Sequence, residues 1–299
     1  MKKIKKRTDK RMAEVFPIII YTVIIIWCVL FMSTLAWAVV QSFKSKTNFY
    51  YDKVGFPSAK YGGMYFGNYE FVFTKMRAIK ADGTWVYFPT MLYNTLFYCI
   101  VYSFFGVFCP MLTSYAYAKY HNRVPFTQIA WWLTLISIYV PLSASLASGL
   151  SLAMRFKYYD NMYAFLITSV GGFGSNFLIY YAVWKGLSWT YAEAAFIDGA
   201  SHTQVLFRVM FPMTVTIFGV LFVTGIINLW ANYQLPLVYL PSYPTLAYGV
   251  YRFQSSVESG ITVPIKIASL IVVAIPLVIL FMAFKEKIMT SLTMGGIKG

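Results

Sequence analysis

Long stretches without a charged residue recur six times along the chain. They run over residues 15–40, 83–118, 124–154, 161–184, 209–251 and 267–284. A helix that crosses a lipid bilayer needs roughly 20 mostly apolar residues. We therefore predict an all-α, polytopic membrane protein with no sheet of any size. Its six transmembrane helices are expected at about 15–40, 88–118, 126–150, 162–184, 211–234 and 265–284.

Prolines divide the fifth stretch, which is too long for one helix. Pro236, Pro241 and Pro244 all lie in its second half. Proline removes a backbone donor and interrupts a helix, so the span is expected to end near residue 234. An outer loop then follows to about residue 262. Pro276 lies inside the last stretch, where neighbouring helices can compensate for the lost hydrogen bond.

Basic residues predict the orientation of the spans. Seven of the first eleven residues are Lys or Arg. Basic residues accumulate on the cytoplasmic side of membrane proteins, so residues 1–14 and 285–299 are expected to be cytoplasmic tails flanking the domain 15–284. The first apolar stretch is longer than the roughly 7–15 apolar residues of a signal peptide. We therefore expect it to be retained as a span.

Composition supports a membrane protein and excludes other classes. The chain is 59% hydrophobic and 12% charged, whereas soluble domains carry about 25% charged residues. Its three cysteines cannot hold together a disulfide scaffold of this length. The net charge of +15 does not indicate nucleic-acid binding, because the basic residues border the spans, where they meet anionic headgroups.

The sequence contains no pattern that indicates an enzyme. It has no Cys/His cluster with metal-ligand spacing and no phosphate-binding loop, so we expect no metal, no cofactor and no catalytic residue. The predicted spans contain amides where ion-driven carriers usually have ionisable groups. Asn94, Asn228 and Asn232, with Trp230 and Tyr233, are candidates for a pathway that carries a neutral polar solute. The alternative for such residues is contact between helices.

The loop between the fourth and fifth spans predicts a short surface helix at about 190–200. Thr190 and Glu193 have the spacing of a capping box, in which the two side chains cap the first turn. Gly199 suits the turn that ends such a helix. Small residues on this helix would let another protein approach closely, but from these residues alone an ordinary connector helix remains an open alternative.

Several motifs resemble those of a known family. Glu193-Ala194-Ala195, then Gly199, then Val209-Met-Phe-Pro212 resemble the EAA loop of bacterial ABC importer permeases. Four further segments are similar to carbohydrate permeases of the maltose-system MalG type. These are Asn68-Tyr69, Asn94-Thr95, Trp230-Ala-Asn-Tyr-Gln-Leu-Pro-Leu237 and the tail Leu292-Thr-Met-Gly-Gly-Ile-Lys-Gly299.

The resemblance implies a function and a set of partners. It implies a multi-pass permease of the bacterial cytoplasmic membrane that forms half of a sugar path with a second, homologous permease. Two copies of an ATPase subunit would hydrolyse ATP, and an extracytoplasmic binding protein would deliver the sugar to the outer loop at about 237–262. The residues implied to couple to the ATPase are Glu193, Ala194, Ala195, Asp198, Gly199 and Pro212. The tail residues implied to reach it are Gly295, Gly296, Lys298 and Gly299.

Two alternatives remain open at this point. One is an ABC importer permease for another solute, such as an osmolyte or a peptide. The other is a membrane-embedded enzyme that modifies lipids. That enzyme would need a charged or metal-binding cluster at the membrane face, and the sequence shows no such cluster.

Overall fold

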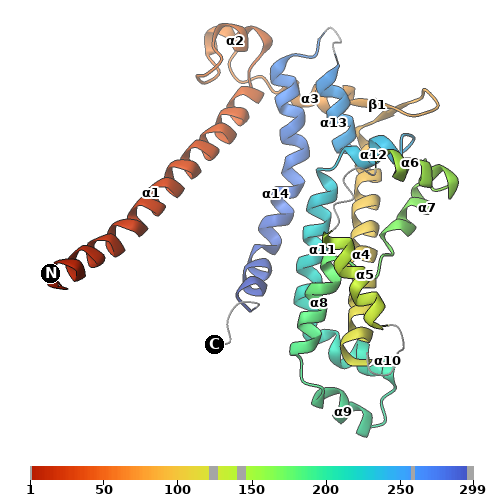
Figure 1. Ribbon diagram of the computed structural model, residues 1–299. Coiled ribbons are helices and arrows are strands. Elements are labelled where there is room, and N and C mark those ends of the chain that lie inside the picture. The colour runs from red at the N-terminus through yellow and green to blue at the C-terminus, as the bar shows by residue number, and fades with distance from the viewer. Residues whose placement is uncertain (1, 121–126, 140–145, 257–259, 295–299) are drawn as a thin grey trace. The chain divides into compact units, whose positions relative to one another are not determined.

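The computed structural model describes all residues except 1, 121–126, 140–145, 257–259 and 295–299 (Figure 1). The predicted tail contacts Gly295, Gly296, Lys298 and Gly299 lie outside the described residues. The chain is mostly helical, with long helices joined by short ones. Its elements are α1 (Lys2–Ser42), α2 (Lys46–Tyr51), η1 (Ala59–Tyr61), α3 (Gly67–Lys75), β1 (Arg77–Ile79), β2 (Trp85–Tyr87), α4 (Phe88–Tyr120), α5 (Thr127–Tyr139), α6 (Leu146–Arg155), α7 (Met162–Leu166), η2 (Ile167–Ser169), α8 (Ser175–Gly186), α9 (Thr190–Ile197), α10 (His202–Gln204), η3 (Val205–Met210), η4 (Pro212–Thr214), α11 (Val215–Trp230), α12 (Gln234–Tyr239), α13 (Leu246–Ser255) and α14 (Val263–Met294).

Four helical segments among the described residues are long and apolar enough to cross a membrane. They are Phe16–Ser42, Phe88–Tyr120, His202–Trp230 and Val263–Glu286. The protein is therefore a multi-pass membrane protein. The count of six spans stays a prediction, because the two remaining stretches fold as shorter helices.

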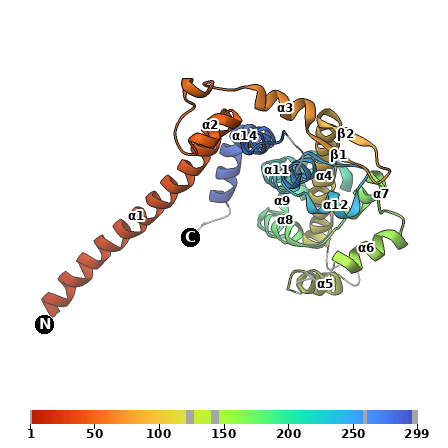
Figure 2. The same ribbon diagram turned by 90° about the horizontal axis from the view of Figure 1, so that it is seen from above.

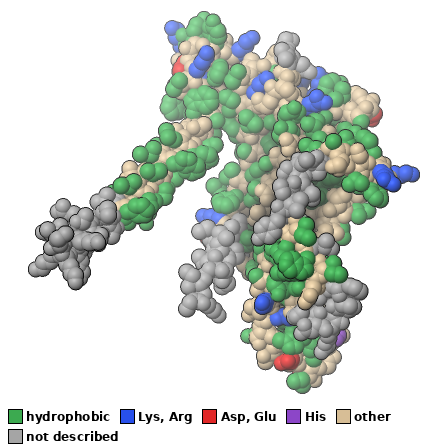
Figure 3. Space-filling model, in the orientation of Figure 1, with side chains coloured by type: hydrophobic (Ala, Val, Ile, Leu, Met, Phe, Trp, Pro, Cys, Tyr) green, Lys and Arg blue, Asp and Glu red, His purple; other side chains and the backbone are tan. Residues whose placement is uncertain are grey.

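The chain divides into two compact units, which are described separately. The first comprises residues 1–74 and 256–272. Its α1 is apolar from Phe16 onward, and within this unit its side chains there are mostly exposed, as the green rod in Figure 3 shows. Such a helix is soluble only in lipid or against another apolar surface.

A polar network holds the loop that follows α1. The Lys44 side chain is fully buried, and its Nζ donates to the backbone oxygen of Asp52 at 2.7 Å. The Asp52 carboxylate accepts from the backbone N–H groups of Gly55 and Val54 and lies 3.6 Å from the Lys44 ammonium. These N–H groups, and then Lys44, lower the pKa of Asp52. Asn68 donates to the carbonyls of Ser42 and Lys44 and so fixes α3 on this loop.

The second unit comprises residues 75–255 and 273–299 and has α4 at its centre. Helices α8 and α11 lie along α4 in both views (Figures 1 and 2). Asn176 of α8 donates to the backbone oxygen of Gly106 in α4 at 2.9 Å. On the other side, a Cβ added to Gly225 of α11 would lie 3.0 Å from the Ser103 hydroxyl of α4. The glycine therefore permits close packing of α11 on α4.

The segment between α12 and α13 is tied down by polar side chains. Asn94 of α4 donates to the Pro244 carbonyl at 3.1 Å, and the Thr95 hydroxyl accepts from the Leu246 N–H at 2.8 Å. The Asp160 carboxylate accepts from both the N–H and the hydroxyl of Ser242. The region that the sequence predicts as an outer loop therefore contains two helices and is anchored by hydrogen bonds.

The fourth predicted stretch folds differently from a continuous helix. It contains α7, the 3₁₀ turn η2, non-helical residues 170–174 and α8. The Gly172 carbonyl accepts from the Thr113 hydroxyl of α4, and a Cβ on Gly172 would meet the Thr113 methyl at 2.6 Å. The break is thus stabilised by a side chain that satisfies a freed carbonyl.

Two further elements differ from the prediction. The third stretch contains α5 and α6, separated by residues 140–145. A hairpin of two three-residue antiparallel strands, β1 and β2, precedes α4, with Ala78 opposite Val86. The sequence predicts no strand in this part of the chain. The buried side chains of Ala78 and Val86 on one face explain how so short a sheet is held, because α13 packs against β1.

Candidate functional site: the surface helix α9 and its seat

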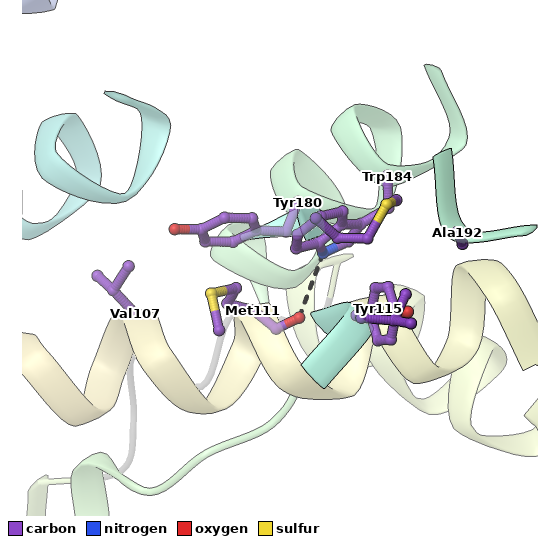
Figure 4. Close-up of a cluster of buried hydrophobic side chains, with 8 residues drawn as sticks. Val107, Met111, Tyr115, Tyr180, Trp184 and Ala192 are labelled. Carbon is purple, nitrogen blue, oxygen red and sulfur yellow. Dashed lines mark hydrogen bonds between the residues drawn. The ribbon is translucent and has the colours of Figure 1, made fainter. Parts of the chain in front are cut away.

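Helix α9 rests on a buried cluster that we call the seat. The seat joins α4, α8, α9 and η3, and its buried members are Val107, Met111, Tyr115, Tyr180, Trp184, Ala192, Val205 and Met210. Figure 4 shows the Tyr180 and Trp184 rings above Met111 and Tyr115, with Ala192 of α9 beside them. The seat thus ties α9 to the helices of the second unit by apolar contact as well as through the chain.

Trp184 is the polar anchor of the seat. Its side chain is fully buried, and its Nε1–H donates to the Met111 carbonyl at 3.2 Å (Figure 4). The same N–H also donates to the Ser114 hydroxyl at 3.2 Å. The Tyr115 ring meets the indole edge-on, with 5.2 Å between ring centroids. A buried indole N–H needs a hydrogen-bond partner, and both partners of this one lie on α4.

The two faces of α9 differ in their surroundings. Ala192 is fully buried in the seat, and Ala195 and Phe196 pack against it. On the opposite face, 86% of the Ile197 side chain and 53% of the Tyr191 side chain are exposed. Helix α9 therefore has one face packed on the seat and one face that the chain leaves exposed.

We call this opposite face the outer face of α9. Its exposed members are Tyr191, Glu193, Ala194, Ile197 and Asp198. Acidic side chains gather at the lower end of the molecule in Figure 3, where Figure 1 shows α9. Ala194 is small enough to let another backbone approach. The outer face therefore combines apolar, acidic and small residues on one short helix.

The cap at the start of α9 differs from the predicted one. Trp189, and not Thr190, is the cap residue, and its own side chain makes no capping hydrogen bond. The Ser188 hydroxyl instead contacts the Thr190 N–H and hydroxyl. A capping box is present one helix later, where Ser201 and Gln204 cap α10 reciprocally. The predicted capping by Thr190 and Glu193 is therefore wrong.

Gly199 ends α9 in a left-handed conformation. Its φ is +81°, and its N–H donates to the Phe196 carbonyl at 3.0 Å. This conformation disfavours residues with a Cβ. No heavy atom lies within 4 Å of the position that a Cβ would take. Pro212, the last residue of the predicted motif, begins the 3₁₀ turn η4 and is exposed.

The predicted pathway residues do not form one cluster of polar groups. Asn94 is buried and bonded to Pro244, and Trp230 donates from its indole to the Val273 carbonyl at 3.0 Å. Asn232 accepts from the Leu235 N–H, which caps α12. The remaining two residues are freer: Asn228 is exposed, and the Tyr233 ring stacks on Tyr251 with 4.4 Å between centroids. For Asn94, Trp230 and Asn232, these bonds favour a packing role.

The chain is similar in sequence to known transport proteins. No family model matches the chain. The arabinooligosaccharides transport system permease protein of Bacillus subtilis is 26% identical, covering 79% of this chain and 80% of that protein. The diacetylchitobiose uptake system permease protein of Streptomyces coelicolor is 22% identical, and the alignment covers 94% of this chain and 88% of that protein.

A solved structure shows the same fold. It is a chain of a bacterial ABC transporter involved in the import of the acidic polysaccharide alginate, with a TM-score of 0.72 and 18% identity. The alignment covers 91% of this chain and 96% of that one. The chain is therefore similar over most of its length to permease proteins of sugar uptake systems, and it has the fold of a chain from an ABC importer. These relatives are transport subunits.

The hydrogen bonds of Trp184 permit a test of how the seat is held together. Replacing Trp184 with phenylalanine keeps most of the apolar volume but removes the Nε1–H bonds to α4. Hydrogen bonds of this kind between membrane helices contribute about 1 kcal/mol, so we expect a lower midpoint of thermal unfolding in detergent, by roughly 3 °C. Trp132→Phe is the control, because 62% of the Trp132 side chain is exposed. Equal midpoints for both variants would contradict the anchoring role of Trp184.

Proposed function

We propose that the chain is a permease and forms half of the translocation path of a carbohydrate importer, together with a second, homologous permease. The observation that carries this proposal is the similarity over most of its length to permeases of oligosaccharide uptake systems. The other half of the path, two copies of an ATPase subunit and an extracytoplasmic binding protein are the partners it requires. The chain would lie in the bacterial cytoplasmic membrane with six spans and both termini cytoplasmic.

In this proposal, α9 is the coupling helix that docks into the ATPase. What supports this role is the contrast between its buried seat and its exposed outer face. Glu193 and Asp198 offer carboxylates to basic groups of the partner, and Ile197 offers an apolar anchor. Ala194 and Gly199 allow close approach. ATP binding would draw the ATPase subunits together and move α9, and the seat would carry that movement into α4 and α8.

Two further contacts follow from the resemblance to carbohydrate permeases. The tail residues Gly295, Gly296, Lys298 and Gly299 would reach the ATPase, and the outer segment at about 237–262 would meet the binding protein. Asn228 and Tyr233 remain the pathway candidates, because hydrogen bonds hold the side chains of the other three, Asn94, Trp230 and Asn232. An importer for a non-sugar solute is the second candidate function, since the outer face of α9 has no bearing on the choice of solute.

Co-purification tests the proposed assembly. The chain is tagged and isolated in mild detergent from its native membrane. We expect a second permease and an ATPase subunit to accompany it, and the binding protein that associates with the complex to hold a saccharide. Isolation of the chain without an ATPase would refute the assembly. A peptide or osmolyte on the binding protein would retain the assembly and refute the carbohydrate substrate.

A further inference from the structure

The last turn of α4 contacts the segment that leads into α9. Lys119 Nζ donates to the Leu187 carbonyl at 2.7 Å and lies 5.7 Å from the centre of the Trp189 ring. The Tyr120 ring meets Trp189 edge-on, with 5.7 Å between centroids. Because Trp189 is the residue just before α9, these contacts fix the entrance of α9 to the end of α4.

The same turn of α4 also contacts the exit of α9. The Tyr120 hydroxyl and His202 Nδ1 lie 3.0 Å apart and share a hydrogen bond. The His202 ring meets Phe196 of α9 edge-on, with 4.8 Å between centroids. Residues 120 and 202 are distant in sequence, so this bond joins α4 to the chain beyond α9.

A backbone turn lies between α9 and His202. Gly199 has a φ of +81° there, and residues 200 and 201 are in no helix. Glycine has the largest backbone freedom of all residues. A movement imposed on α9 would therefore be absorbed partly at this turn if the chain alone transmitted it. The Tyr120–His202 bond and the Phe196–His202 contact bypass the turn.

We propose that Tyr120 and His202 are positioning residues that transmit the movement of α9 directly to α4. Helix α4 contacts both α8 and α11, so a movement that reaches α4 reaches the centre of the second unit. This inference rests on the proposed function, because it requires that the ATPase moves α9. It adds a route that the motif of the α9 loop does not contain, since Tyr120 lies outside that loop.

Three conservative variants separate the hydrogen bond from the ring contacts. Tyr120→Phe keeps the ring against Trp189 and removes the hydroxyl. His202→Phe keeps a ring against Phe196 and removes Nδ1. His202→Asn keeps a polar group near the Nδ1 position and removes the ring. Tyr163→Phe is the control for loss of a hydroxyl, because 69% of the Tyr163 side chain is exposed.

The assay is uptake of sugar per ATP hydrolysed, in proteoliposomes that contain the whole transporter. A hydrogen bond contributes about 1 kcal/mol, which corresponds to about fivefold. We expect Tyr120→Phe and His202→Phe each to lower this ratio about fivefold, and the double variant to lower it no further. His202→Asn removes the ring contact with Phe196, which is the other link of the route, and should lower the ratio as well. All variants should bind the ATPase normally.

The outcomes distinguish this inference from the proposed function. An unchanged ratio in Tyr120→Phe would overturn the inference, as would additive losses in the double variant or an unchanged ratio in His202→Asn. A transporter whose unmodified permease does not bind the ATPase would instead refute the proposed function, before any variant is compared.

Discussion

Replacing Ile197 with aspartate is expected to weaken binding of the ATPase roughly thirtyfold and to lower the uptake of sugar with it. The Ile197 side chain is 86% exposed, so the substitution should change the stability of the permease by less than about 0.5 kcal/mol. An apolar anchor at the centre of an interface, however, contributes about 2 kcal/mol or more, which is roughly thirtyfold in affinity. Glu193→Lys should also lower the affinity for the ATPase, because it reverses a charge on the outer face of α9.

Thr203→Asp is the matched control for Ile197→Asp. Thr203 is also exposed, but it lies in α10, off the outer face of α9, and a carboxylate is favourable in the first turn of a helix. Membrane abundance, ATPase affinity and uptake are measured for all three variants. Normal ATPase affinity in Ile197→Asp would contradict docking through the outer face. A loss of abundance in both α9 variants would support a connector helix with only a structural role.

Replacing Gly199 with leucine should impair coupling, whereas asparagine should be tolerated better. The φ of +81° costs a residue with a Cβ about 1–2 kcal/mol, and asparagine is one of the few such residues that adopt this conformation readily. We expect about a tenfold loss of uptake for leucine and a smaller loss for asparagine. Since a Cβ here meets no atom of the permease itself, the loss arises from the turn or from the docked partner.

The comparison of the two Gly199 variants identifies the cause of the loss. Equal losses for leucine and asparagine would indicate that the partner lies too close for any side chain. A leucine variant with normal uptake would contradict a role for this turn. ATPase co-purification is measured in parallel, because a clash lowers binding, whereas a strained turn leaves binding largely intact.

The sequence predicts where the apolar segments lie but not where they break. Residues 161–184 carry no charge, and hydropathy alone favours one continuous helix. The break at residues 170–174 depends on Gly172 lying against Thr113 of α4. The glycines at 171, 172 and 174 were the available signal, since clustered glycines interrupt regular helix.

Local spacing does not decide which cap forms. Thr190 with Glu193 and Ser201 with Gln204 both have the spacing of a capping box. In the structure, Ser201 has an extended backbone, with ψ of 160°, whereas Trp189 takes the cap of α9 with a helical ψ of −18°. The backbone conformation at each candidate position, which the spacing does not contain, therefore distinguishes the cap that forms from the one that does not.

The contacts around α9 could not be predicted from the sequence. The motif containing Glu193 and Gly199 identifies the loop as a candidate site. The position of α9 is determined by its packing on the seat, which no motif predicts. Tyr120 and His202 meet only because α4 ends beside the loop. No periodicity or motif signals a contact over such a separation.

ATP-driven uptake by the reconstituted transporter tests the central claim most directly. Proteoliposomes contain the permease, the second permease and the ATPase, with the binding protein and its labelled saccharide outside and ATP inside. We predict that the saccharide accumulates in the lumen only when ATP, the ATPase and the binding protein are all present. Accumulation that persists without ATP, or with an ATPase that cannot hydrolyse it, would contradict the account.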